Sequence, residues 1–195
     1  MRKGGQKILS LLCVISILLI LCFAYYVPVS AQPHFSRKEI APMWDNLNAN
    51  PPSQSELASK QYLNTDNLGN TGFDDRLTNT LNTFMTTSGA YELAWGGIFT
   101  SSSIKNAIIS TTDAGYPILA NGISGGNDSI ITLPWYPEKT YHFICVYGYG
   151  NYGATTYVCD PVAYADCRGF EKVIPKYGYA TDTFYKFVYP RGIVY

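Results

Sequence analysis

Apolar residues recur every three or four positions in three segments of the chain, residues 36–47, 73–87 and 101–112. This spacing places the apolar side chains on one face of a helix. Two further stretches, residues 91–98 and 114–120, hold the short apolar and aromatic runs that are typical of strands. Because the helical patterns precede most of the strand patterns, the sequence predicts an α+β fold with an antiparallel sheet.

The first predicted helix has two possible starting points. Ser36 and Glu39 match the two ends of a capping box, which would begin a helix at Ser36. Pro42 fits poorly beyond the first turn of a helix, because it lacks a backbone N–H and its ring clashes with the preceding turn. The helix therefore either kinks at Pro42 or begins nearer Ala41.

Residues 141–161 are predicted to form a β-hairpin, since their centre is rich in the Gly and Asn residues that mark a turn. His142 lies near the start of the first strand and Asp160 at the end of the second. Pairing these two residues centres the turn on Asn151, a residue type favoured in turns. The hairpin thus predicts that a ring nitrogen of His142 hydrogen-bonds Asp160, directly or through one water.

The His142 and Asp160 pair has a functional and a structural interpretation. A histidine can act as a general base and an aspartate can orient it, which together make two thirds of a nucleophilic triad. Alternatively, His142 is a half-buried histidine of the sheet, and Asp160 is a turn residue that ends its strand before Pro161.

The first 31 residues read as a targeting segment. Three basic residues precede the apolar run 8–26, and small residues up to Ala31 form a plausible signal-peptidase site before Gln32. The apolar run is also close to the lower limit for a membrane span. The sequence is compatible with a signal peptide that is cleaved and with an N-terminal anchor that is retained. Either way, we expect the chain to be secreted or anchored at the extracellular face of the membrane.

The remaining residues, 32–195, are enough for one domain with a sizeable core. Three of the 14 basic residues and none of the 14 acidic residues precede Gln32, so this part carries 11 basic and 14 acidic residues, a net charge of −3. Nucleic acid is therefore not an expected partner, because its binders carry basic patches. The sequence also gives no reason to expect a metal or cofactor. The 17 tyrosines favour a sheet rich in β-formers, with a recognition surface as the alternative.

Five cysteines occur, of which two lie in the apolar leader. The other three are Cys145, Cys159 and Cys167, an odd number for an oxidising compartment. Cys159 and Cys167 are close in sequence, whereas the predicted hairpin register places Cys145 only diagonally from Cys159. We therefore expect a disulfide between Cys159 and Cys167, with Cys145 free and buried.

Several short segments, in order from about residue 50 onward, resemble one family. They are Pro52–Ala58, Gly72–Phe73, Leu81–Asn82, Ala114–Ile118, His142, Val146–Tyr149 and Asp160–Pro161. Together they resemble the bacterial C-thirty-nine-like peptidases, which are papain-fold cysteine peptidases related to bacteriocin-processing domains. The resemblance implies N-terminal helices packed on an antiparallel sheet, with His142 as the general base and Asp160 as its orienting partner.

The chain departs from this family at the nucleophile. In the family a cysteine opens a Cys-Gly-Pro helix, and a glutamine a few residues earlier stabilises the oxyanion. Here no cysteine occurs between Cys22 and Cys145. One register puts Ser36 in the place of the cysteine and Gln32 in that of the glutamine, although the former also suits a helix cap. The other register, matched on the proline of the motif, puts Ile40 there.

The remaining cysteines do not replace the missing one. Successive side chains of a strand project from opposite faces of the sheet. The side chain of Cys145 is therefore expected on the opposite face from that of His142, and the side chain of Cys159 on the opposite face from that of Asp160. Only Cys167, in a loop after the hairpin, is sterically possible. The sequence therefore favours an exported papain-fold domain that is catalytically inactive and binds a peptide or protein ligand in the remnant cleft. An active hydrolase that uses Ser36 or another nucleophile, and a structural or toxin-like secreted module, are the alternatives.

Overall fold

The computed structural model describes residues 38–39, 58–59, 61–66, 71–85, 89–124, 133, 135–136, 139–164 and 169–195. Statements about the fold concern these ranges.

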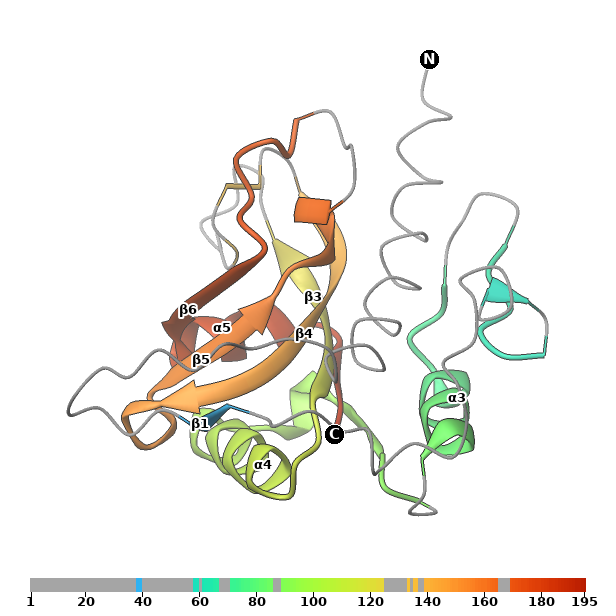
Figure 1. Cartoon of the computed structure of the whole chain (residues 1–195), viewed down its shortest axis with the longest axis horizontal. Helices are drawn as coiled ribbons and strands as arrows, with labels where there is room; N and C mark the ends of the chain where they lie inside the picture. Colours follow the sequence, from blue (N-terminus) through green and yellow to red (C-terminus); the bar gives the residue numbers. More distant parts are fainter. Residues whose placement is uncertain are drawn as a thin grey trace.

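One antiparallel sheet forms the centre of the described part, with the strand order β2-β7-β3-β4-β5-β6 (Figure 1). The short strand β1 pairs with β4 outside this path. The strands are β1 (Lys38–Glu39), β2 (Leu93–Trp95), β3 (Ile118–Ser124), β4 (Thr140–Gly150), β5 (Thr155–Cys159), β6 (Lys176–Ala180) and β7 (Gly192–Val194).

The helices of the described part cover the sheet on both faces. Helix α3 (Asp75–Phe84) packs on one face, and α4 (Ser101–Asp113) and α5 (Thr181–Val188) contribute to the core on the other. Figure 1 shows α3 well apart from α5, with the sheet between them. The sheet therefore separates two apolar cores, which we call the α3 core and the α4/α5 core.

Local sequence explains where α3 and α4 begin. The Asp74 carboxylate accepts a hydrogen bond from the backbone N–H of Arg76 at 2.9 Å, which satisfies one of the unpaired donors at the start of α3. Thr100 and Ser103 form a reciprocal capping box at the start of α4. The helices predicted over residues 73–87 and 101–112 are confirmed with slightly different bounds, and so is the α+β fold class.

The helix predicted to begin at Ser36 is wrong at its start. Lys38 and Glu39 are not helical but form β1, which pairs with Tyr149 and Gly148 of β4. Strand β3 pairs with β4 only as far as Val146, so the end of β4 has backbone groups that another strand can pair with. A helix that begins nearer Ala41 lies outside the described residues.

The predicted hairpin is confirmed as β4 and β5, but its register differs from the expected one. Tyr147 is an extra residue on β4, so that Val146 pairs with Val158 whereas Gly148 pairs with Tyr157. The turn spans Asn151–Gly153, with all three residues at positive φ. Because the bulge and this turn shift the strands, Asp160 does not pair with His142 but follows the last β5 residue.

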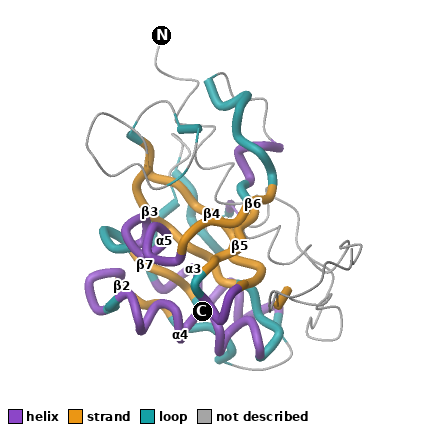
Figure 2. The backbone as a smooth tube through the Cα atoms, turned by 90° about the vertical axis from the view of Figure 1, so that its left-hand side faces the viewer, coloured by secondary structure: helices purple, strands orange, loops and turns teal. Residues whose placement is uncertain are grey.

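Helix α5 lies close against β3, and a glycine makes this approach possible (Figure 2). A Cβ atom at Gly122 would lie 2.1 Å from the carbonyl oxygen of Phe187. That atom belongs to the backbone of α5, so it cannot rotate away as a side chain would. The residue opposite Gly122 on β4 is His142, so this contact also sets the position of the candidate site.

We predict that Gly122→Ala lowers the free energy of unfolding by about 3 kcal/mol or more, because the added methyl group forces α5 away from the sheet. The melting temperature of the chain should then fall by roughly 6–12 °C. Gly97→Ala is the matched control, since a Cβ there meets nothing within 4 Å. A Gly122→Ala variant as stable as Gly97→Ala would show that α5 does not pack on β3 in this way.

Candidate active site

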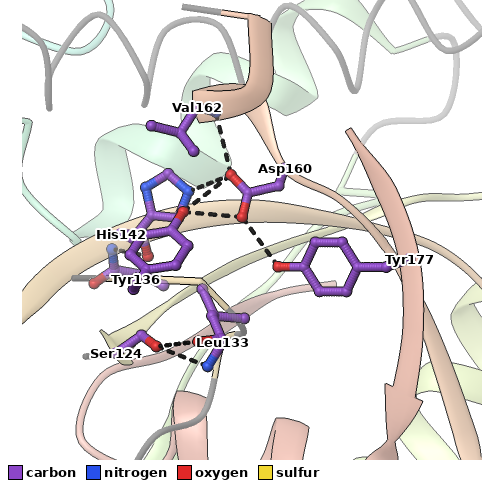
Figure 3. Close-up of polar contacts among 8 residues, drawn as sticks. Ser124, Leu133, Tyr136, His142, Asp160, Val162 and Tyr177 are labelled. Atoms are coloured by element: carbon purple, nitrogen blue, oxygen red, sulfur yellow. Dashed lines mark hydrogen bonds and ion pairs between the residues drawn. The ribbon is translucent and has the colours of Figure 1, made fainter. Parts of the chain in front are cut away.

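His142 and Asp160 meet on the face of the sheet that carries the α4/α5 core. His142 lies in β4, and Asp160 is the first residue after β5. Their side chains are 1% and 0% exposed, and His142 Nε2 lies 2.8 Å from Asp160 Oδ1 (Figure 3). The predicted hydrogen bond is therefore confirmed as a direct one, although the two residues are not cross-strand partners.

Four groups donate hydrogen bonds to the Asp160 carboxylate. They are His142 Nε2, the hydroxyls of Tyr136 (2.9 and 3.0 Å to the two oxygens) and Tyr177 (3.0 Å), and the backbone N–H of Val162 (3.1 Å). Such a shell suits an ionised carboxylate, which accepts hydrogen bonds through both oxygens and donates none. Four donors match the roughly four acceptor sites of a carboxylate.

This shell determines which nitrogen of His142 could act as a base. Because the ionised Asp160 carboxylate only accepts, the proton of a neutral His142 ring must sit on Nε2. The lone pair then lies on Nδ1. The arrangement therefore orients His142 as a general base would be oriented, with Nδ1 as its reacting atom.

Burial and the Asp160 charge keep the two tyrosines protonated. Burial, followed by the negative charge of Asp160, raises the pKa of Tyr136 well above the usual value of 10.0. The same two causes, in the same order, raise the pKa of Tyr177. Both hydroxyls therefore remain hydrogen-bond donors to Asp160 across the physiological range.

Sequence reasoning missed both tyrosines as site residues. Tyr136 precedes β4 and Tyr177 lies in β6, so they are 41 positions apart in the chain. Tyrosines are common in strands, and no spacing or motif distinguishes these two from the others. Only the placement of β6 beside β5 brings Tyr177 to Asp160.

Two further side chains hold the backbone around the pair. Asn121 of β3 donates through Nδ2 to the backbone carbonyl of His142 at 3.1 Å, and Arg191 Nε donates to Asn121 Oδ1 at 3.0 Å. The Ser124 hydroxyl accepts from the N–H of Leu133 at 2.7 Å, within the same part of the site (Figure 3). The Asn121 contact positions β4 from the neighbouring strand, the Ser124 contact holds the segment that leads to Tyr136, and neither touches the His142 ring.

The cysteines of the described part lie on the opposite face of the sheet from this site. Cys145 and Cys159 are fully buried in the α3 core, on the opposite face from His142 and Asp160. The alternation argument is therefore confirmed, and neither thiol can attack a group held at His142 Nδ1. The other candidate site residues, Gln32, Ser36 and Cys167, lie outside the described residues, so their roles and a disulfide between Cys159 and Cys167 stay predictions.

We predict that the free energy of unfolding falls at alkaline pH, from about pH 9 through the buried Cys145 thiol of the reduced chain and from about pH 10 through the buried tyrosines. Each buried tyrosine with a raised pKa, including Tyr136 and Tyr177, loses its proton more readily in the unfolded chain than in the folded one. Stability is therefore fully present below the unfolded pKa and decreases by about 1.4 kcal/mol per pH unit and per group above it. Urea unfolding at a series of pH values measures this slope.

The Tyr177→Phe variant tests the contribution of one hydroxyl. It should lower the neutral-pH stability by about 1–3 kcal/mol, because Asp160 loses a donor, and it should make the alkaline slope shallower by one group. Tyr189→Phe is the control, since its ring is 52% exposed. An unchanged alkaline slope in Tyr177→Phe would contradict the buried phenol–carboxylate arrangement.

One of the comparisons with known proteins identifies a family. No curated protein matches the chain, and no solved structure matches it. The model of one family, described as the Peptidase_C39 like family, matches residues 35–186, which include His142, Asp160 and both of the tyrosines that bind Asp160. The match covers most of the chain, and the papain-like α+β sheet agrees with it. The chain therefore belongs to the Peptidase_C39 like family.

Proposed function

We propose that this chain is an exported peptidase-like domain that binds an extended peptide beside His142 and Asp160 without hydrolysing it. The proposal is supported by the contrast between the hydrogen-bonded His142–Asp160 pair and the lack of a cysteine in the preceding part of the sequence. His142 and Asp160 are buried and bonded, whereas the described cysteines lie in the α3 core and no cysteine occurs between Cys22 and Cys145.

The missing thiol argues against turnover on chemical grounds. A cysteine peptidase attacks through a thiolate that is paired with imidazolium, and a serine hydroxyl in its place is a much weaker nucleophile. A base without a nucleophile gives little acceleration beyond what binding supplies. Ser36 at the position of the nucleophile would therefore abolish activity more readily than convert it.

Two exposed apolar side chains support binding next to the pair. Trp135 is 43% exposed, precedes Tyr136 in sequence and packs its ring edge-on against Tyr177. Ile174 is 44% exposed and precedes Pro175, whose carbonyl accepts from the backbone N–H of Asp160. Exposed aromatic and aliphatic residues of this kind anchor peptide side chains.

The proposal that the chain is exported is based on its first 31 residues. A basic start, the apolar run 8–26 and small residues before Gln32 favour a signal peptide or an anchor. Within the ranges that the structure describes, no helix has the length and apolarity to cross a membrane, and residues 8–26 lie outside them. The proposed site of action is the extracellular face, with residues 8–26 as the possible membrane attachment.

We predict that the full chain binds fluorescein-labelled unfolded casein saturably and releases no labelled fragments from it. Trp135→Ala should weaken binding by at least about tenfold, because aromatic anchors commonly contribute about 2 kcal/mol or more. Tyr152→Ala is the control, since this residue is 79% exposed but lies in the hairpin turn at the other end of β4. Fluorescence anisotropy measures binding, and gel electrophoresis detects fragments.

The same experiment separates the alternatives. Fragments that disappear with His142→Ala, in a preparation free of other proteases, would establish a working hydrolase and refute the inactive domain. Absence of saturable binding in the wild-type chain would instead favour a structural module.

The direction of β1 bears on which residue occupies the position of the family's nucleophile. Strand β1 runs antiparallel to β4, with Lys38 opposite Tyr149 and Glu39 opposite Gly148, so the chain moves toward the His142 end of β4 as it proceeds. This direction favours the register with Ile40 at the nucleophile position over the one with Ser36. A thiol at a helix N-terminus beside imidazole has a lowered pKa and increased reactivity.

We therefore expect Ile40→Cys to react with iodoacetamide at least about tenfold faster than an ordinary exposed cysteine. The rate should fall when His142→Ala is added, and Ser36→Cys serves as the matched control. Peptide-level mass spectrometry distinguishes the new thiol from the native ones. If neither thiol shows His142-dependent alkylation, the segment before residue 50 does not complete a papain-like site.

A further inference from the structure

A row of three residues crosses the sheet behind the His142–Asp160 pair. Cys145 of β4 lies directly opposite Cys159 of β5, and Cys159 lies directly opposite Lys176 of β6. Residues that are opposite each other in an antiparallel pair project from the same face of the sheet. Both cysteines belong to the α3 core, and the Lys176 ammonium lies 5.4 Å from the ring centre of Tyr147 in that core.

The register brings the two cysteines within bridging distance. Opposite residues of antiparallel strands have Cα atoms about 4.5–5.5 Å apart, and disulfides join Cα atoms about 4.4–6.8 Å apart. We propose that Cys145 and Cys159 form a cross-strand disulfide when the chain meets an oxidant, in place of one between Cys159 and Cys167. This inference does not depend on peptide binding and goes beyond the proposed function.

The turn over Asn151–Gly153 and the bulge at Tyr147 together explain why the sequence suggested a different partner. A hairpin centred on Asn151 places Cys145 diagonally from Cys159, whereas the extra residue on β4 and the turn over Asn151–Gly153 make them opposite. The expectation that these two cysteines have a poor relative geometry is therefore wrong.

The course of the chain after β5 also favours Cys145 over Cys167. Cys159 projects into the α3 core, but Val162, three residues later, is buried in the α4/α5 core. The segment directly after Cys159 is thus held on the α4/α5 side by the Val162 side chain and by the hydrogen bond from the Val162 N–H to Asp160, whereas Cys145 lies on the α3 side with Cys159.

The bridge needs an external oxidant, and a small disulfide such as oxidised glutathione can supply it. The thiolate of one cysteine attacks a sulfur of the oxidant, which forms a mixed disulfide and releases one glutathione thiolate. The second cysteine loses its proton and attacks the protein sulfur of the mixed disulfide, which releases the other glutathione. The protein loses two protons and two electrons, and the oxidant becomes two thiols.

Burial decides when this exchange occurs. Cys145 and Cys159 are both 0% exposed. Burial also raises the pKa of the Cys145 thiol well above the usual value of 9.0, and the nearby Lys176 only partly opposes this. The thiols therefore react while the chain folds, before α3 covers them, and the finished bridge is protected from reduction.

The bridge would fix the strands that carry the candidate site. Cys145 is three residues after His142 on β4, and Cys159 directly precedes Asp160. The closed loop spans the 15 residues from Cys145 to Cys159, including the Tyr147 bulge and the turn. A covalent link there prevents the slippage of β4 against β5 that would separate His142 from Asp160.

Disulfide mapping of the full chain tests the proposal. The chain is refolded in a mixture of oxidised and reduced glutathione, remaining thiols are blocked with N-ethylmaleimide in denaturant, and the protein is cut with chymotrypsin. Aromatic residues separate Cys145, Cys159 and Cys167 from one another, so each linkage among them gives a distinct peptide pair. We expect the Cys145 and Cys159 peptides to be linked, and the melting temperature to exceed that of the reduced chain by roughly 6–12 °C.

Two variants serve as matched controls. Cys167→Ser should keep both the linked peptides and the shift in melting temperature, whereas Cys145→Ser should lose both. A Cys159–Cys167 link in the wild-type chain would overturn the proposal, as would blocking of both Cys145 and Cys159 after oxidative refolding. The wild-type map decides the matter even if a variant fails to fold.

Discussion

The buried carboxylate of Asp160 is the constraint on which the rest of the site depends. A charge with no exposed surface is costly unless donors surround it, and this one receives hydrogen bonds from four groups. Those donors come from the segment before β4, from β4 itself, from the turn after β5 and from β6. Each of these elements must be in place for Asp160 to be satisfied, so the network ties one half of the sheet together.

This dependence gives His142 and Asp160 a role in the fold that does not require catalysis. Removal of His142 would leave a buried carboxylate with fewer donors, which destabilises a fold whether or not catalysis occurs. The pair is therefore a structural element as well as a chemical one. The presence of the pair alone does not establish turnover, which depends on whether a nucleophile lies beside Nδ1 of His142.

The sheet divides the chemistry of the domain between its two faces. His142, Asp160 and their tyrosines share the α4/α5 face, whereas Cys145 and Cys159 share the α3 face. The two cysteines are nevertheless close in sequence to His142 and Asp160. Cys145 follows His142 by three residues on β4, and Cys159 directly precedes Asp160 at the end of β5. Because alternate residues of one strand point to opposite faces, the two thiols and the His142–Asp160 pair lie on opposite sides of the same strands.

The sequence alone determined the elements that depend on local spacing. The apolar periodicity of α3 and α4, the turn residues of the β4–β5 hairpin and the meeting of His142 with Asp160 all follow from short stretches of chain. The tertiary structure decided the rest. Tyr177 reaches Asp160 only through the pairing of β6 with β5, and Lys38 and Glu39 become a strand only because β4 extends beyond β3. The Tyr147 bulge, which brings Cys145 opposite Cys159, likewise results from how whole strands fit together, and no local propensity encodes that fit.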